Sequence, residues 1–163
     1  MTLLDGFKYQ RSSTTTFFYP ANDSIFKNHE VIIRACQILR EIGEKDYSIV
    51  FTLNGNENEH INQLNNESDR CFLNILWLGN LPRDEVFKLY SKSILLFPSY
   101  IETIGLPIYE AISVGCPIIV ADCKYAKDVA KGYNDVEFFD YYDAEKLADL
   151  MRKQIDISRS SLK

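Results

Sequence analysis

Long apolar runs are absent from this sequence of 163 residues. The longest uninterrupted apolar stretches span only a handful of residues, whereas a membrane-spanning helix needs about 20. The N-terminus also lacks the positively charged start and apolar core of a secretory signal. We therefore expect a cytoplasmic protein with no integral membrane segment.

A surplus of basic residues is absent as well. The chain has 18 Lys and Arg residues against 23 Asp and Glu residues, for a net charge of −5, and it has no basic stripe. Nucleic-acid binding usually needs a basic face against the phosphate backbone. The charge balance therefore argues against a nucleic-acid partner.

Metal-binding spacings are also missing. No Cys-x-x-Cys pair occurs, and the two histidines share no ligand spacing with the four cysteines. Three of the cysteines fall on or beside apolar segments, so we expect reduced thiols in or near the core. The sequence therefore predicts no metal site and no cofactor. The residues concerned are Cys36, Cys71, Cys116, Cys123, His29 and His60.

Two common phosphate-binding motifs do not occur. Neither G-x-G-x-x-G nor G-x-x-x-x-G-K-[ST] appears, which argues against a dehydrogenase and against a P-loop domain. A flavodoxin-like receiver domain would need an acidic cluster after the first strand, and Tyr19-Pro20-Ala21 stands there instead.

What is present is a globular composition, with 46% apolar and 25% charged residues. Short apolar or β-branched runs alternate with segments of helical periodicity. The runs predict strands at 15–19, 48–53, 74–78, 94–97, 118–121 and 136–139. The periodic segments predict helices at 27–42, 83–91, 125–131, from near Pro107 to Gly115 and from Asp143 onward, while 57–67 fits a helix or an open loop.

This alternation is typical of a parallel sheet with helices on both faces. We predict an α/β domain over residues 14–155, with a Rossmann-like parallel sheet of about six strands. Residues 1–13 are predicted to be a linker or the start of a fragment. Residues 156–163 are predicted to be a frayed C-terminal tail.

The most informative stretch runs from residue 94 to residue 123. A buried strand ends at Pro98-Ser99, and a helix follows with Pro107 in its first turn. Glu102 falls in the loop between them, and Glu110 lies one turn inside the helix. We expect both carboxylates at the C-terminal edge of the sheet, where parallel α/β folds bind ligands.

One phrase with fixed internal spacing contains Pro98-Ser99, Glu102, Gly105-Leu106-Pro107, Glu110-Ala111, Gly115, Pro117 and Asp122. It resembles the signature of the C-terminal domain of retaining GT-B glycosyltransferases, the group 1 family that uses nucleotide-sugar donors. The resemblance covers roughly residues 14–152, almost the whole chain.

The resemblance implies that Glu102 lies by the donor sugar and that Glu110 holds the ribose hydroxyls of the nucleotide. Backbone amides between them would hold the diphosphate at the helix start. The residues that would supply these amides are Thr103, Ile104, Gly105 and Leu106. Gly105 also lets a phosphate approach without a Cβ in the way. Ser99, Tyr100 and Thr103 flank the first carboxylate and either touch the sugar or pack within the loop.

Lys27 is the first candidate for charge stabilisation on the departing diphosphate. It follows the loop after the first strand, and a lysine at a helix start opposes the helix dipole. Phe26-Lys27-Asn28 also resembles the lysine-containing phrase of the family at this place. The family pairs this lysine with an arginine just after the first strand, but no arginine occurs between Arg11 and Arg34. Either Lys27 and the helix amides suffice, or Arg11 or a group of another domain supplies the missing charge.

Two glycines end adjacent strands at the same edge. Gly55 and Gly79 either form tight turns or let a base or ribose lie close to the backbone. In similar transferases the loop after the second of these glycines meets the base, which makes Asn80 and Leu81 its expected neighbours.

The expected activity is therefore retaining transfer of a sugar from a UDP- or GDP-sugar. No Asp-x-Asp triplet occurs, and by resemblance no metal is required. The acceptor-binding N-terminal domain has no room in this chain, so we expect it elsewhere in the same polypeptide or on a separate subunit. That domain would carry any attachment to the inner membrane face, and the chain alone would be inactive. The alternative is a non-catalytic nucleotide-binding or partner-docking α/β module.

Overall fold

The computed structural model describes residues 15–161, which form one six-stranded sheet in the order β3-β2-β1-β4-β5-β6. Every neighbouring pair of strands is parallel. The strands are β1 (Thr15–Tyr19), β2 (Tyr47–Phe51), β3 (Ile75–Trp77), β4 (Ile94–Phe97), β5 (Ile118–Ala121) and β6 (Val136–Phe139). The predicted α/β fold with a Rossmann-like parallel sheet is confirmed.

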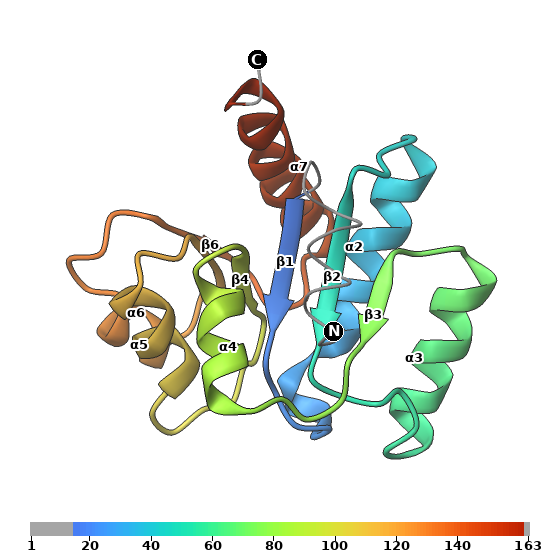
Figure 1. The fold of residues 1–163 in the computed structure, drawn as a ribbon, viewed down its shortest axis with the longest axis horizontal. Helices are drawn as coiled ribbons and strands as arrows, with labels where there is room; N and C mark the ends of the chain where they lie inside the picture. Colours follow the sequence, from blue (N-terminus) through green and yellow to red (C-terminus); the bar gives the residue numbers. More distant parts are fainter. Residues whose placement is uncertain (1–14, 162–163) are drawn as a thin grey trace.

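Helices cover both faces of this sheet. Figure 1 shows α4 in front of it and α2 behind it. The helical elements are η1 (Ile25–Lys27), α2 (His29–Glu41), α3 (Glu59–Arg70), α4 (Arg83–Tyr90), α5 (Leu106–Ser113), α6 (Lys124–Val129) and α7 (Ala144–Ser161). Because helices bury both faces of the sheet, the sequences of the central strands are nearly continuous apolar runs.

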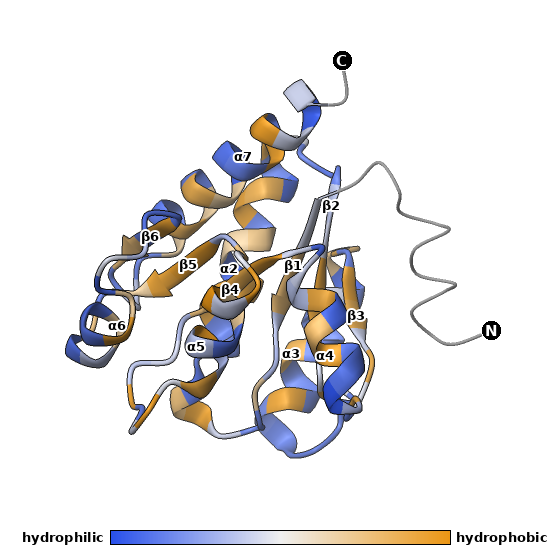
Figure 2. Cartoon of the chain, turned by 60° about the vertical axis from the view of Figure 1, so that its left-hand side comes forward, coloured by the Kyte–Doolittle hydropathy of each residue, from blue (hydrophilic) through white to orange (hydrophobic). Residues whose placement is uncertain are grey.

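The core lies along the middle strands. All residues of β1, β2, β4 and β5 are buried. Figure 2 shows these apolar strands inside and the polar residues on the outer sides of the helices. The ring of Phe18 packs edge-on against Tyr90 of α4, with centroids 5.4 Å apart, which ties that helix to the sheet.

The predicted helix at 27–42 is wrong at its start. Lys27 ends the short 3-10 turn η1, and α2 begins only at His29. Asn28 between them has a left-handed backbone with φ of 63°. Asparagine tolerates this conformation, and its side chain donates hydrogen bonds to the carbonyls of Pro98 and Tyr141, at 3.0 and 2.8 Å. These long-range bonds hold the break in the helix.

Residues 57–67, compatible with a helix or a loop, belong to the helix α3. Asn58 caps it, with its side-chain oxygen accepting a hydrogen bond from the Ile61 amide at 2.9 Å. Other boundaries differ from expectation by one or two residues. Strand β2 ends at Phe51 rather than Leu53, and α6 ends at Val129.

The expected frayed tail is wrong for residues 156–161, because α7 continues to Ser161. Ile155 is fully buried, and Arg159 forms ion pairs with Glu44 and with Asp46 beyond the end of α2. Asp143, where the last predicted helix begins, accepts a hydrogen bond from the Lys146 amide at 3.0 Å and so caps the start of α7. Residues 1–13, which include Arg11, lie outside the described residues.

The strand order reverses direction between β1 and β4. Chain connections leave β1 toward β2 on one side and leave β4 toward β5 on the other. The loops that follow these two strands therefore separate at the carboxyl edge of the sheet, which lies at the bottom of Figure 1. Ligands of open α/β sheets bind at such a point.

Candidate functional site

The loops after β1 and β4 meet at this edge. The Tyr100 amide and the Ser99 hydroxyl both donate hydrogen bonds to the carbonyl of Phe26, each at 3.3 Å. Tyr19, at the end of β1, donates its hydroxyl to the Lys27 carbonyl at 2.7 Å. These bonds fix the backbone of Lys27 against the loop that carries Glu102.

Lys27 and Glu102 form an ion pair across the two loops. The Lys27 Nζ lies 2.7 Å from one carboxylate oxygen of Glu102 and 3.0 Å from the other. Each side chain is only 13% exposed. Two charges this far removed from water need partners, and the contact provides one for each.

A cleft of 390 Å³ opens beside this pair. It brings together six of the predicted site residues, which come from η1, from the loop before α5 and from the first residue of α5. Its lining consists of Asn22, Phe26, Lys27, Ile101, Glu102, Thr103, Ile104, Gly105, Leu106 and Pro107. The structure therefore places these six residues at one cleft, and their roles in donor binding stay predictions.

The start of α5 faces the cleft without a side-chain cap. Gly105 occupies the N-cap position with φ of 70°, and no side chain accepts a hydrogen bond there. The first amides of a helix need acceptors and carry partial positive charge. The α5 start can therefore take an anionic group of a ligand.

Glu110 does not line this cleft. It lies between α5 and α4, where its Oε2 is 2.8 Å from Nη1 of Arg83 and its Oε1 accepts a hydrogen bond from Tyr90 at 3.2 Å. Its side chain is 12% exposed. The structure thus separates the two predicted carboxylates into different surroundings at the same edge.

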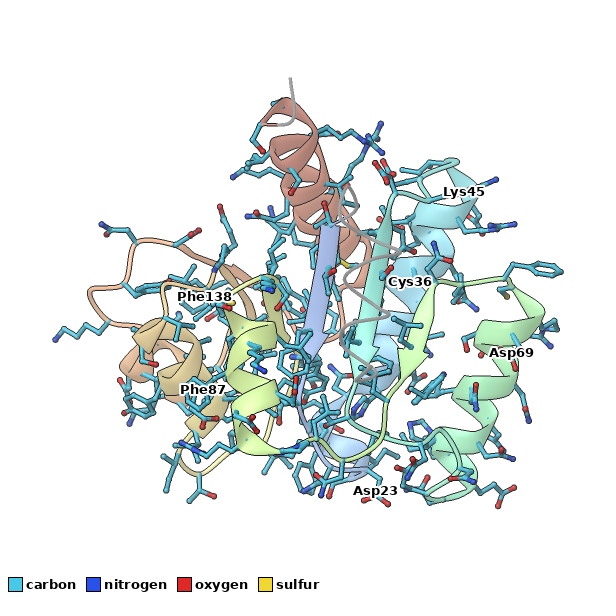
Figure 3. All side chains as sticks on the ribbon, in the orientation of Figure 1. Asp23, Cys36, Lys45, Asp69, Phe87 and Phe138 are labelled. Carbon is cyan, nitrogen blue, oxygen red and sulfur yellow. The ribbon has the colours of Figure 1, made fainter. Side chains whose placement is uncertain are left out.

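A second cleft of 480 Å³ lies on the other side of Asn22, which lines both clefts. It contains the predicted pair Asn80 and Leu81. Its lining residues are Pro20, Ala21, Asn22, Asp23, Thr52, Leu53, Glu57, Asn80, Leu81 and Val86. Figure 3 labels Asp23 at the lower edge of the sheet, where this cleft opens.

Gly55 and Gly79 line neither cleft. A Cβ on Gly55 would lie 2.5 Å from the side chain of Asn65, and a Cβ on Gly79 would lie 2.6 Å from the side chain of Asn54. Close internal packing therefore explains both glycines, in agreement with the tight-turn alternative.

Sequence reasoning missed Glu57, whose carboxylate fills the turn after β2. It accepts hydrogen bonds from the amides of Asn54, Gly55 and Asn56, at 2.6 to 3.1 Å. Burial opposes ionisation of this carboxyl group, but these backbone bonds outweigh it and lower the pKa of Glu57. An acidic residue directly after Asn-Gly-Asn was the available signal.

Sequence reasoning also missed the partners of Glu110. Arg83 is the first residue of α4, so its positive charge opposes the helix dipole there. Tyr90, at the other end of the same helix, is buried at 1% exposure. Nothing local in the sequence indicates that its hydroxyl reaches α5.

The four cysteines are free thiols, and burial raises the pKa of Cys36 and of Cys116 to about 12. Within residues 15–161, His, Cys, Asp and Glu side chains nowhere gather in a group of three that could hold a metal ion. In the same range, no helix has the length and apolar character needed to cross a membrane.

Comparison with known proteins gives a consistent result. The family described as "Glycosyl transferases group 1" matches residues 7–162. A segment of 79 residues, 48% of the chain, is 32% identical to the serotype-specific mannosyltransferase WbdA of Escherichia coli and covers 9% of that protein. The sucrose-phosphate synthase of Thermosynechococcus elongatus shares the fold, with a TM-score of 0.78 and 16% identity.

That structural match covers 93% of the chain but 39% of the synthase. The chain therefore spans well under half of each of these two proteins, and it corresponds to one half of a GT-B fold. The family match extends over nearly all of the sequence, including both clefts and the Lys27–Glu102 pair. The chain belongs to the group 1 glycosyltransferase family.

Proposed function

We propose that this chain is the donor-binding domain of a retaining glycosyltransferase that uses a UDP- or GDP-sugar. The observation that carries the proposal is the Lys27–Glu102 pair beside the uncapped start of α5. One cleft contains a cation, a carboxylate and free helix amides, and a nucleotide-sugar donor has three features that such groups can recognise. These features are the diphosphate, the sugar hydroxyls and the charge on the leaving group.

In this proposal the diphosphate lies on the α5 amides and Lys27 neutralises part of its charge. Glu102, released from the ion pair, accepts hydrogen bonds from the donor sugar. The nucleoside extends past Asn22 toward Asn80 and Leu81, which line the adjoining cleft. Glu110 takes the ribose hydroxyls from its place between α4 and α5.

The proposed reaction retains the anomeric configuration by attack on the face that the diphosphate leaves. The acceptor oxygen bonds to the anomeric carbon, the bond from that carbon to the phosphate oxygen breaks, and the acceptor proton passes to the leaving phosphate. Lys27 and the α5 amides hold the growing negative charge, which removes the need for a metal ion.

Transfer also needs an acceptor site, which we propose lies on another domain, in the same polypeptide or on a separate subunit. The partial coverage of both relatives supports this arrangement. We therefore expect the purified chain of 163 residues to bind nucleotide and to transfer no sugar on its own. Measurable transfer to a sugar acceptor by this chain would contradict the requirement for a second domain.

Calorimetric titration with UDP, GDP and ADP, without added metal, tests the donor site. One diphosphate should bind, and Lys27→Met should weaken it by about 1–3 kcal/mol, as expected for a lost hydrogen bond to a charged group. The corresponding nucleoside should be affected far less, because it has no phosphate to contact Lys27. Lys45→Met is a matched control, since Figure 3 shows Lys45 at the opposite edge of the sheet. Absence of binding by all three diphosphates would refute the proposal for this chain.

One observation favours the alternative of a non-catalytic nucleotide-binding or partner-docking module. Pro20 and Ala21 follow β1 where the family has its arginine, and among residues 15–33 Lys27 is the only Lys or Arg. A domain that binds nucleotide without stabilising a leaving group needs one cation fewer. Sugar transfer by a protein that contains both domains, abolished by Lys27→Met, would exclude this alternative.

A further inference from the structure

Glu110 is held by two side chains from a neighbouring helix. Arg83, at the start of α4, lies 2.8 Å from its Oε2, and Tyr90, at the end of α4, donates its hydroxyl to its Oε1 at 3.2 Å. One partner thus meets each carboxylate oxygen. A carboxylate has about four acceptor positions, and the contacts within residues 15–161 use two of them.

Tyr90 is a fixed donor in this arrangement. It is 1% exposed, and its ring packs edge-on against Phe18 and Phe87 with centroids 5.4 and 5.6 Å away. Burial, together with the negative charge of Glu110, raises the pKa of Tyr90 well above its ordinary value. The phenol therefore keeps its proton and donates it toward Glu110.

Arg83 is constrained as well, although it is 72% exposed. Its guanidinium lies 5.0 Å from the ring centre of Phe87, one turn further along α4, which Figure 3 labels. A cation at a helix start opposes the helix dipole. The ion pair with Glu110 and the contact with Phe87 offset that cost.

We propose that Arg83 and Tyr90 are positioning residues that hold Glu110 as an acceptor for the vicinal hydroxyls of the donor ribose. This inference rests on the proposed donor site. Two oxygens, each fixed by one donor, leave a pair of acceptor positions that matches two adjacent hydroxyls. Glu102 lacks this arrangement, because the Lys27 Nζ contacts both of its oxygens.

The test compares a nucleoside diphosphate with its 2′,3′-dideoxy form. The probe is whichever of UDP, GDP and ADP the unmodified chain binds. Arg83→Met keeps the side-chain length without the charge, and Tyr90→Phe removes only the hydroxyl. Each should weaken binding of the ribose form about fivefold to tenfold, the effect of about one ordinary hydrogen bond, because Glu110 keeps its charge but loses one of the two donors that fix it. Binding of the dideoxy form should change less than twofold.

Two controls separate positioning from general damage. Arg70→Met removes an arginine of similar exposure, 74%, that pairs with Glu67 on α3, and it should leave both affinities unchanged. Arg83→Lys should restore part of the preference for the ribose form, and thermal unfolding verifies that every variant is folded. Equal weakening of both forms by Arg83→Met and Tyr90→Phe would overturn this inference while leaving the donor site intact. Absence of any nucleotide binding by the unmodified chain would instead overturn the proposed function, and this inference with it.

Discussion

Separate and combined replacement of Lys27 and Glu102 tests whether their ion pair is retained for ligand binding. At 3 Å and an effective dielectric constant of about 20, the attraction between the two charges is about 5 kcal/mol. Lys27→Met removes the cation beside a carboxylate that is 13% exposed in the unmodified chain, and the Ser99 hydroxyl, at 3.5 Å, remains as a weak hydrogen-bond donor. We expect each single replacement, Lys27→Met or Glu102→Leu, to lower the free energy of unfolding by about 2–3 kcal/mol.

The double variant should behave differently. Removing both charges also removes both desolvation costs, so its stability should lie within about 1 kcal/mol of the unmodified chain. The coupling energy between the two sites is then about 4 kcal/mol, close to the Coulomb attraction. The double variant should also lose nucleotide diphosphate binding, which would show that the pair serves the ligand rather than the fold.

The assay is urea unfolding at low and high salt, with the pair Lys153–Glu137 as the matched control. Its atoms are 2.9 Å apart, but its side chains are 57% and 42% exposed. Solvent screening should hold the coupling energy of this exposed pair below about 0.5 kcal/mol, and salt should remove it. A Lys27–Glu102 coupling no larger than the control, or a double variant as unstable as the two singles combined, would refute the reasoning.

Three further predictions concern stability. Gly105→Ala should cost about 1–2 kcal/mol in unfolding free energy, because φ at this residue is 70° and an alanine is strained there; an unchanged urea midpoint would contradict this. Burial, aided by the charges of His60 and Lys27, lowers the pKa of His29 from 6.5 to about 3. Between these two pH values the imidazole of His29 is protonated in the unfolded chain but not in the folded one. Stability should therefore fall as pH drops, by about 2 kcal/mol between pH 8 and pH 5, and His29→Phe should remove most of this difference; a variant that retains it would show that other groups cause it. Ile155→Ala should cost about 2–5 kcal/mol, because the side chain is fully buried, whereas a loss below about 0.5 kcal/mol would show that α7 does not pack on the core at this residue.

Local signals in the sequence predicted most of the elements. Periodicity and turn residues act over a few neighbours, so strands such as Ile94–Phe97 and Ile118–Ala121 were predicted with their observed bounds. The cleft beside Glu102 was predictable for the same reason, since most of its lining comes from one continuous stretch. Lys27 could join it because both loops follow strands at one edge of a parallel sheet.

The break before α2 could not be predicted in this way. Asn28 adopts its left-handed backbone while bonding to Pro98 and Tyr141, which are 70 and 113 residues away in the chain. The end of α7 is similar, because Arg159 finds its partners in Glu44 and Asp46. Contacts with distant residues therefore determine where α2 begins and where α7 ends, and local composition does not show these contacts.

The sequence by itself determined the order of strands and helices, and it singled out both candidate carboxylates, because those depend on short-range pattern and on one contiguous phrase. Only the tertiary structure decided their surroundings. It paired Glu102 with Lys27 from 75 residues earlier, and Glu110 with Tyr90 from 20 residues earlier. The partner of each carboxylate depends on how α4, α5 and the loop after β1 pack around the sheet. The residue pattern along the chain does not indicate which distant side chains this packing brings together.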